Sequence, residues 1–182
     1  MSQIFNLWLA SIKQYLLISF FSSHPGRLPK CSPCLVLTIS AYFLIVALLL
    51  ATALNFFSLL VQVILEIIML TILAYGTLRF RHKLERLEQT VSALIGTNLV
   101  VTTMSAFILY LIAPEMLSAN VDTEKISPSV LNFTLLMLVW NLAIISLIFK
   151  RALEIRTFGA SLIAINYFLL YEFLVVGILD LK

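Results

Sequence analysis

Long runs of apolar residues, interrupted by short polar or proline-rich segments, set the pattern of this chain. Between Cys34 and Leu78 the only charged residue is Glu66. A single helix over this stretch would measure about 68 Å, about twice the thickness of a bilayer core. We therefore expect two membrane-spanning helices here, joined by a tight turn at 52–55. The later apolar runs predict three more, so the expected spans cover residues 34–54, 56–78, 90–113, 130–149 and 158–179.

The first segment, residues 1–23, has an amphipathic pattern rather than a uniformly apolar one. At helical spacing its polar and small residues share about one third of the circumference, and Trp8 and Tyr15 lie among the apolar residues opposite. Such a helix is typical of the membrane surface, so we expect an interfacial amphipathic helix. A cleaved signal peptide is the alternative, but no Lys or Arg precedes the apolar run and Lys13 interrupts it. The expected polar stripe consists of Ser2, Gln3, Asn6, Ala10, Lys13 and Gln14.

Basic residues in the short connections predict the orientation. Residues 24–33 contain three prolines and a glycine and are expected to form a linker. The segment 79–88 has four Lys or Arg residues, and short loops this basic stay in the cytoplasm. We therefore expect a cytoplasmic N-terminus, five spans and an outside C-terminus. Ten of the twelve Lys and Arg residues then lie inside, namely Lys13, Arg27, Lys30, Arg79, Arg81, Lys83, Arg86, Lys150, Arg151 and Arg156.

Composition supports a membrane protein. Of the 182 residues, 62% are hydrophobic and 12% are charged, whereas a soluble domain carries about 25% charged residues. The expected fold is an all-α polytopic membrane bundle, with one five-span domain over residues 34–179 in a bacterial inner membrane. The net charge of +3 sits in short loops beside the bilayer, so nucleic acid is not an expected partner. The expected partners are lipid and either another membrane protein or a second copy of the chain.

Two carboxylic acids lie inside predicted spans, where a charge costs about 2.5–3.5 kcal/mol. By helical rise, Glu66 would lie about 15 Å and Glu172 about 11 Å from the outer surface. Gln62 lies one turn from Glu66, and Asn141 reaches a comparable depth. One interpretation is a proton or cation site formed by these four residues. The other is a set of carboxyl and amide groups that join neighbouring helices.

The pair Cys31-Ser-Pro-Cys34 lies at an expected helix start, where the helix dipole favours a thiolate. One interpretation is a thiol–disulfide exchange centre like that of small quinone-linked membrane oxidoreductases. The other is that both residues only pack at the start of the first span, on the reducing side of the membrane. No residue set predicts another catalytic site, a cofactor site or a metal site.

The five expected spans, the proline-rich segment Arg27-Leu-Pro-Lys-Cys-Ser-Pro33 before the first of them and the short outside C-terminus resemble the Yip family of Rab-interacting membrane proteins. Small five-span proteins of bacterial inner membranes share this layout. The resemblance implies a membrane scaffold, adaptor or assembly protein without catalytic activity. A small carrier or proton-coupled permeation unit that uses Glu66 and Glu172 is the first alternative. A cytoplasm-facing thiol redox protein is the second.

Overall fold

The computed structural model describes residues 2–50, 56–112 and 128–179. The described residues form helices and no strand, which confirms the all-α expectation. The expected turn at 52–55 and nearly all of the loop at 114–128 lie outside the described residues. The elements in chain order are α1 (Ser2–Ser19), the 3-10 turn η1 (Pro25–Arg27), α2 (Ser32–Leu50), α3 (Phe56–Phe80), the 3-10 turn η2 (Leu84–Arg86), α4 (Leu87–Ile112), α5 (Pro128–Leu153) and α6 (Thr157–Leu179).

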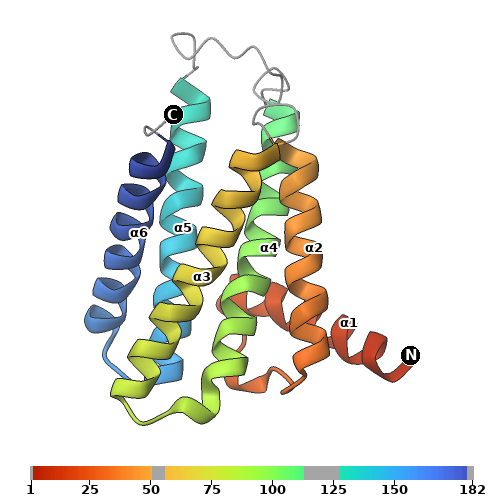
Figure 1. Ribbon diagram of the computed structural model, residues 1–182, viewed down its shortest axis with the longest axis vertical. Helices are drawn as coiled ribbons and strands as arrows, with labels where there is room; N and C mark the ends of the chain where they lie inside the picture. Colours follow the sequence, from red (N-terminus) through yellow and green to blue (C-terminus); the bar gives the residue numbers. More distant parts are fainter. Residues whose placement is uncertain (1, 51–55, 113–127, 180–182) are drawn as a thin grey trace.

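Five helices, α2 to α6, lie along the long axis of the molecule and alternate in direction (Figure 1). Four of them, α3 to α6, are long and apolar enough to cross a membrane. Within the residues that the structure describes, the apolar stretch of α2 is shorter, Ser32–Leu48, so four candidate spans are found there and the sequence predicts five. Helix α1 lies across the lower part of the bundle, at the end where α3 connects to α4 and α5 connects to α6 (Figure 1).

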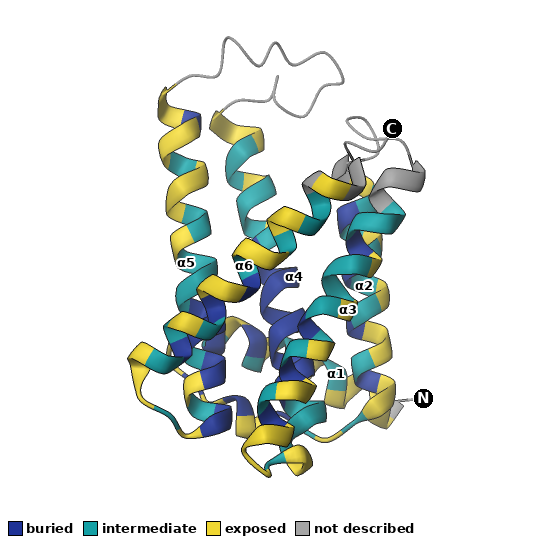
Figure 2. Ribbon diagram, turned by 60° about the vertical axis from the view of Figure 1, so that its left-hand side comes forward, coloured by how far each residue is buried: buried dark blue, intermediate teal, exposed yellow. Residues whose placement is uncertain are grey.

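Helix α4 is central because it contacts α1, α2, α3 and α5. Every residue from Thr90 to Val101 is buried, and this stretch is dark blue in Figure 2. A helix enclosed on all sides cannot place its polar side chains in solvent, so these must find partners inside the protein. The buried polar residues of this stretch are Thr90, Ser92, Thr97 and Asn98.

The second half of α1 is part of the core, which the interfacial expectation did not include. The Tyr15 ring covers Gly96 of α4 so closely that a Cβ atom at residue 96 would lie 2.4 Å from it. The Tyr15 hydroxyl shares hydrogen bonds with Ser92 at 2.8 Å and with Thr38 of α2 at 3.3 Å. The C-terminal end of α1 is also fastened to α5, since the Trp140 indole N–H donates to the Ser19 carbonyl at 3.0 Å.

The first half of α1 is exposed on its polar and its apolar sides. Apolar residues such as Phe5, 54% exposed, lie bare alongside the exposed polar residues of the predicted stripe. The helix ends at Ser19 rather than at residue 23, because the chain turns there. Thus α1 has an exposed N-terminal half and a C-terminal half inserted between other helices.

Helices α1, α3 and α5 end in the same way. One residue adopts a positive φ in each case: Phe21 (61°), His82 (54°) and Glu154 (55°). Glycine usually occupies this position of a Schellman motif, because other side chains are strained there. The following N–H donates to the carbonyl five residues earlier: Ser22 to Leu17 (2.8 Å), Lys83 to Leu78 (2.9 Å) and Ile155 to Lys150 (3.2 Å).

Candidate functional site

Glu66 of α3 is hydrogen-bonded by side chains of two neighbouring helices. The Tyr42 hydroxyl of α2 donates to Oε2 at 2.5 Å, and the Asn98 amide of α4 donates to Oε1 at 2.7 Å. Glu66 itself is partly buried, whereas Tyr42 and Asn98 are 5% and 4% exposed. Both carboxyl oxygens therefore have partners within the bundle.

A second polar contact lies beside Glu66 and connects α3 to α6. The Gln62 side chain, one turn before Glu66, lies beside the hydroxyl of Tyr171 and interacts with it. The rings of Tyr171 and Tyr167 stack with centroids 6.0 Å apart. Tyr167 is buried at 6% exposure, and Tyr171 is half-buried. We call Tyr42, Gln62, Glu66, Asn98 and Tyr171 the polar layer.

The hydrogen bonds of the polar layer offset the free-energy cost of placing Glu66 among apolar helices. A carboxyl group in the middle of a span costs about 2.5–3.5 kcal/mol. Interhelical hydrogen bonds in membranes contribute about 0.6–2 kcal/mol each. The two bonds to Glu66 therefore offset a large part of its insertion cost, and they connect α2, α3 and α4 at one level.

The four residues expected to form the intramembrane site are not brought together. Asn141 and Glu172 were candidate partners of Glu66, and the structure shows Tyr42 and Asn98 as the hydrogen-bond partners of its two carboxyl oxygens instead. Glu172 is exposed on α6. Gln62 lies one helical turn before Glu66 and interacts with Tyr171 of α6.

Asn141 lies in a different place, at a cavity of about 420 Å³ lined by residues of α2, α4 and α5. Its Oδ1 atom is buried and has no hydrogen-bond partner among the described residues. The other polar residues of this cavity are Thr102, Ser105 and Thr134. The cavity is otherwise lined by apolar side chains.

Sequence reasoning missed Tyr42 and Asn98. Asn98 could have been predicted as a partner of Glu66, since it is the only asparagine in the expected third span and lies near the middle of α4. Tyr42 was less visible, because a tyrosine in a span is read as apolar. Which helix faces turn toward Glu66 depends on how α2 and α4 pack against α3.

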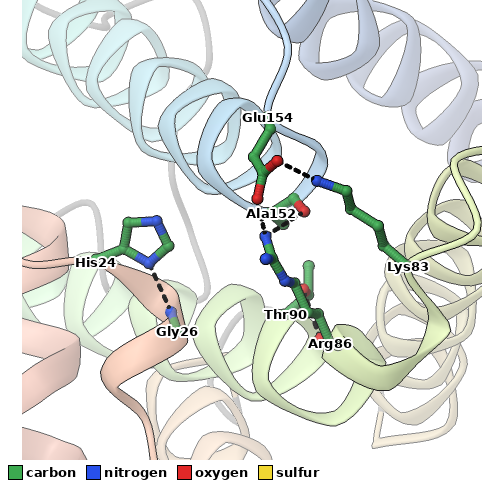
Figure 3. Close-up of polar contacts among 7 residues, drawn as sticks. All are labelled: His24, Gly26, Lys83, Arg86, Thr90, Ala152 and Glu154. Carbon is green, nitrogen blue, oxygen red and sulfur yellow. Dashed lines mark hydrogen bonds and ion pairs between the residues drawn. The ribbon is translucent and has the colours of Figure 1, made fainter.

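At the end of the bundle beside α1, an ion-pair cluster joins two connections (Figure 3). Glu154, directly after α5, pairs with Lys83 at 2.5 Å and with Arg86 at 2.8 Å. Arg86 also donates to the carbonyl of Ala152 at 3.3 Å. Hydrogen bonds from Lys83 and Arg86, and then their charges, lower the pKa of Glu154. The cluster fixes the α3–α4 connection against the α5–α6 connection.

Beside this cluster lies a cavity of about 480 Å³, lined by His24, Pro25, Gly26, Arg27, Arg86, Gln89, Thr90, Ala152 and Glu154. The Gly26 N–H donates to Nδ1 of His24 at 2.9 Å (Figure 3). Burial, and then the charges of Arg151, Arg86 and Arg27, lower the pKa of His24. A neutral imidazole is therefore favoured, and its Nδ1 can accept the hydrogen bond that holds η1.

The two cysteines are joined to each other. Cys31 and Cys34 form a disulfide at the start of α2. No group of three or more His, Cys, Asp or Glu side chains that could hold a metal ion occurs in the part of the chain that the structure describes.

Comparisons with protein-family models, with curated proteins and with solved structures found no match to this chain.

Proposed function

We propose that the protein spans the membrane five times, with α2 as the first span. The 19 residues of α2 would measure about 28 Å, close to the hydrocarbon thickness of about 30 Å. Helix α2 also packs against two of the longer helices, α3 and α4, and runs along the bundle with them (Figure 1). The basic residues of the connections favour a cytoplasmic α1 and an outside C-terminus, in a bacterial inner membrane.

In this membrane the protein would act as a scaffold or adaptor for another membrane protein, without catalytic activity. The observation that carries this proposal is the use of Glu66 as a connection between helices. Its two oxygens accept hydrogen bonds from α2 and α4, so this carboxyl group holds three helices of the bundle together. A transported ion would have to compete with Tyr42 and Asn98 for those oxygens.

The alternative carrier would need Glu66 to take up and release a proton during turnover. Glu66→Gln separates the two functions, because glutamine keeps an acceptor for Asn98 and gains a donor for Tyr42, but cannot titrate. Glu66→Ala removes both hydrogen bonds. For a scaffold, the glutamine variant should keep its melting temperature and its cellular abundance, while the alanine variant should lose about 1–3 kcal/mol of stability.

The test combines thermal unfolding in detergent with proton flux into liposomes that contain the purified protein. We expect no flux above that of empty liposomes for the wild type or for Glu66→Gln. Glu172→Gln is the matched control, because Glu172 is exposed on α6. Proton uptake by the wild type that disappears in Glu66→Gln and persists in Glu172→Gln would establish the carrier instead. A stoichiometric complex recovered by crosslinking in intact membranes would identify the partner of the scaffold.

A further inference from the structure

The cysteine pair lies at the junction between the linker and α2, outside the polar layer. Cys31 immediately precedes α2, and its carbonyl accepts from the N–H of Leu35 at 3.1 Å, the first bond of the helix. Cys31 is therefore the N-cap residue, and Cys34 is the third residue of the helix. The N-cap side chain normally supplies an acceptor for one of the first free N–H groups.

The sulfur of Cys31 fills this role. The N–H of Cys34 donates to Sγ of Cys31 at 3.3 Å. A thiolate is a stronger acceptor than a neutral sulfur, and the positive end of the helix dipole also favours a negative charge at this position. When the disulfide is reduced, this geometry stabilises Cys31 as a thiolate.

The two sulfurs differ in access. Cys34 is 2% exposed, whereas Cys31 is partly exposed. An incoming thiolate can therefore reach Cys31 but not Cys34. An accessible sulfur followed by a shielded one is the arrangement that lets the second cysteine resolve a mixed disulfide on the first.

From these contacts, we infer that Cys31 and Cys34 form a thiol–disulfide exchange site for a small anionic thiol of the glutathione type. Two cations favour an anionic reactant, since Lys30 directly precedes Cys31 and Arg27 is exposed on the same linker. They outnumber the one nearby carboxylate, Glu88, which accepts a hydrogen bond from Ser32 at 3.0 Å. This inference does not depend on the proposed scaffold function.

The exchange is balanced in two steps. A glutathione thiolate attacks Sγ of Cys31, the Cys31–Cys34 bond breaks, and Cys34 leaves as a thiolate that takes up a proton. A second glutathione thiolate then attacks the glutathione sulfur of the mixed disulfide, and Cys31 leaves as a thiolate. Two electrons pass from two glutathione molecules to the pair, and the products are the dithiol and oxidised glutathione. The reverse sequence oxidises the pair.

The proposed orientation places the pair on the cytoplasmic side, where the glutathione pool is reducing and disulfides form transiently. The dithiol is then the resting form, and the disulfide marks oxidation.

The test uses the full chain in lipid nanodiscs, with mass spectrometry to count bound glutathione. After treatment with oxidised glutathione, reduced Cys34→Ser should trap one glutathione on Cys31. Cys31→Ser should react at least tenfold more slowly, because its remaining thiol is buried. Ser32→Ala is the matched control, since it removes the Ser32–Glu88 hydrogen bond of 3.0 Å without touching either sulfur. If Cys34→Ser folds poorly, Cys34→Ala gives the same measurement.

Wild-type protein in mixtures of reduced and oxidised glutathione should pass between the disulfide and the dithiol in one two-electron step. Equal trapping in both serine variants would overturn the inference. So would a pair that stays fully oxidised, or fully reduced, across all mixtures. A protein dithiol of the thioredoxin type is the comparison reactant, and exchange with it but not with glutathione would overturn the assignment of the reactant.

Discussion

The two ends of the bundle differ in packing although their helices have similar apolar sequences. Near α1, residues Thr90–Val101 of α4 are all buried, as are most residues from Ile144 to Leu153 of α5. Toward the other end, the same two helices expose large side chains, such as Phe107 and Leu136 at 64% and 63% (Figure 2). The difference coincides with α1, which contacts α2 and α4 and lies across the lower end of the bundle (Figure 1). A sixth helix thus completes the core where five helices leave space.

The largest effect on this difference in packing is expected where α1 lies closest to α4. In Gly96→Ala the new methyl group would meet the Tyr15 ring at 2.4 Å, so α1 must move or the core must open. We expect a loss of about 1–3 kcal/mol from overpacking. Thermal unfolding in detergent measures the stability, and protease cleavage of α1 measures its docking.

Gly76→Ala is the matched control for Gly96→Ala. Gly76 also lies within a helix, but a Cβ atom there would have no contact within 4 Å. This substitution should stabilise the protein by up to about 1 kcal/mol through helix propensity. If both variants shift stability in the same direction, α1 does not dock against α4 as described.

Removing the Tyr15 hydroxyl tests the contact between α1 and α4 with a smaller expected loss of stability. Tyr15→Phe keeps the ring over Gly96 but deletes the hydrogen bonds to Ser92 and Thr38. We expect a loss of about 1 kcal/mol, since both partners are buried. Tyr110→Phe at the open end, where the tyrosine is 61% exposed, should have almost no effect on the melting temperature. Equal effects of the two variants would mean that the ends are packed alike.

A smaller effect should appear as a pH dependence at the end beside α1. The pKa of His24 is lowered in the folded protein, so the unfolded chain binds more protons near pH 6. The contribution of neutral His24 to the free energy of unfolding is therefore complete above the ordinary pKa of 6.5. This contribution is lost as the pH falls below that value. His24→Asn keeps an acceptor for the Gly26 N–H and does not titrate. The melting temperature of the wild type should fall between pH 7 and 5.5, and that of His24→Asn should fall less.

The smallest expected effect concerns Glu154, whose ion pairs with Lys83 and Arg86 are exposed to water. Because the pKa of Glu154 is lowered in the folded protein, its contribution to stability is complete above the ordinary pKa of 4.5. This contribution is lost as the pH falls below that value. Glu154→Gln should lower the melting temperature slightly at low ionic strength. Since salt screens exposed charges, the difference from the wild type should vanish in high salt. A difference that persists there would show that packing, rather than charge, explains the effect.

The sequence by itself determined that the chain is helical and where most helices lie. Backbone groups in lipid must bond internally, so each long apolar run forms a helix, and polar segments separate the runs. The cost of placing Glu66 inside a span also identified it as a residue that needs partners.

Only the tertiary structure decided which partners Glu66 has and where α1 lies. In a membrane, an apolar side chain gains little by facing another helix instead of lipid, so hydropathy does not show which face of a helix packs. Packing depends on shape, as where Gly96 admits the ring of Tyr15. Once α2 and α4 pack against α3 in this way, Tyr42 and Asn98 reach Glu66, while Asn141 and Glu172 face elsewhere.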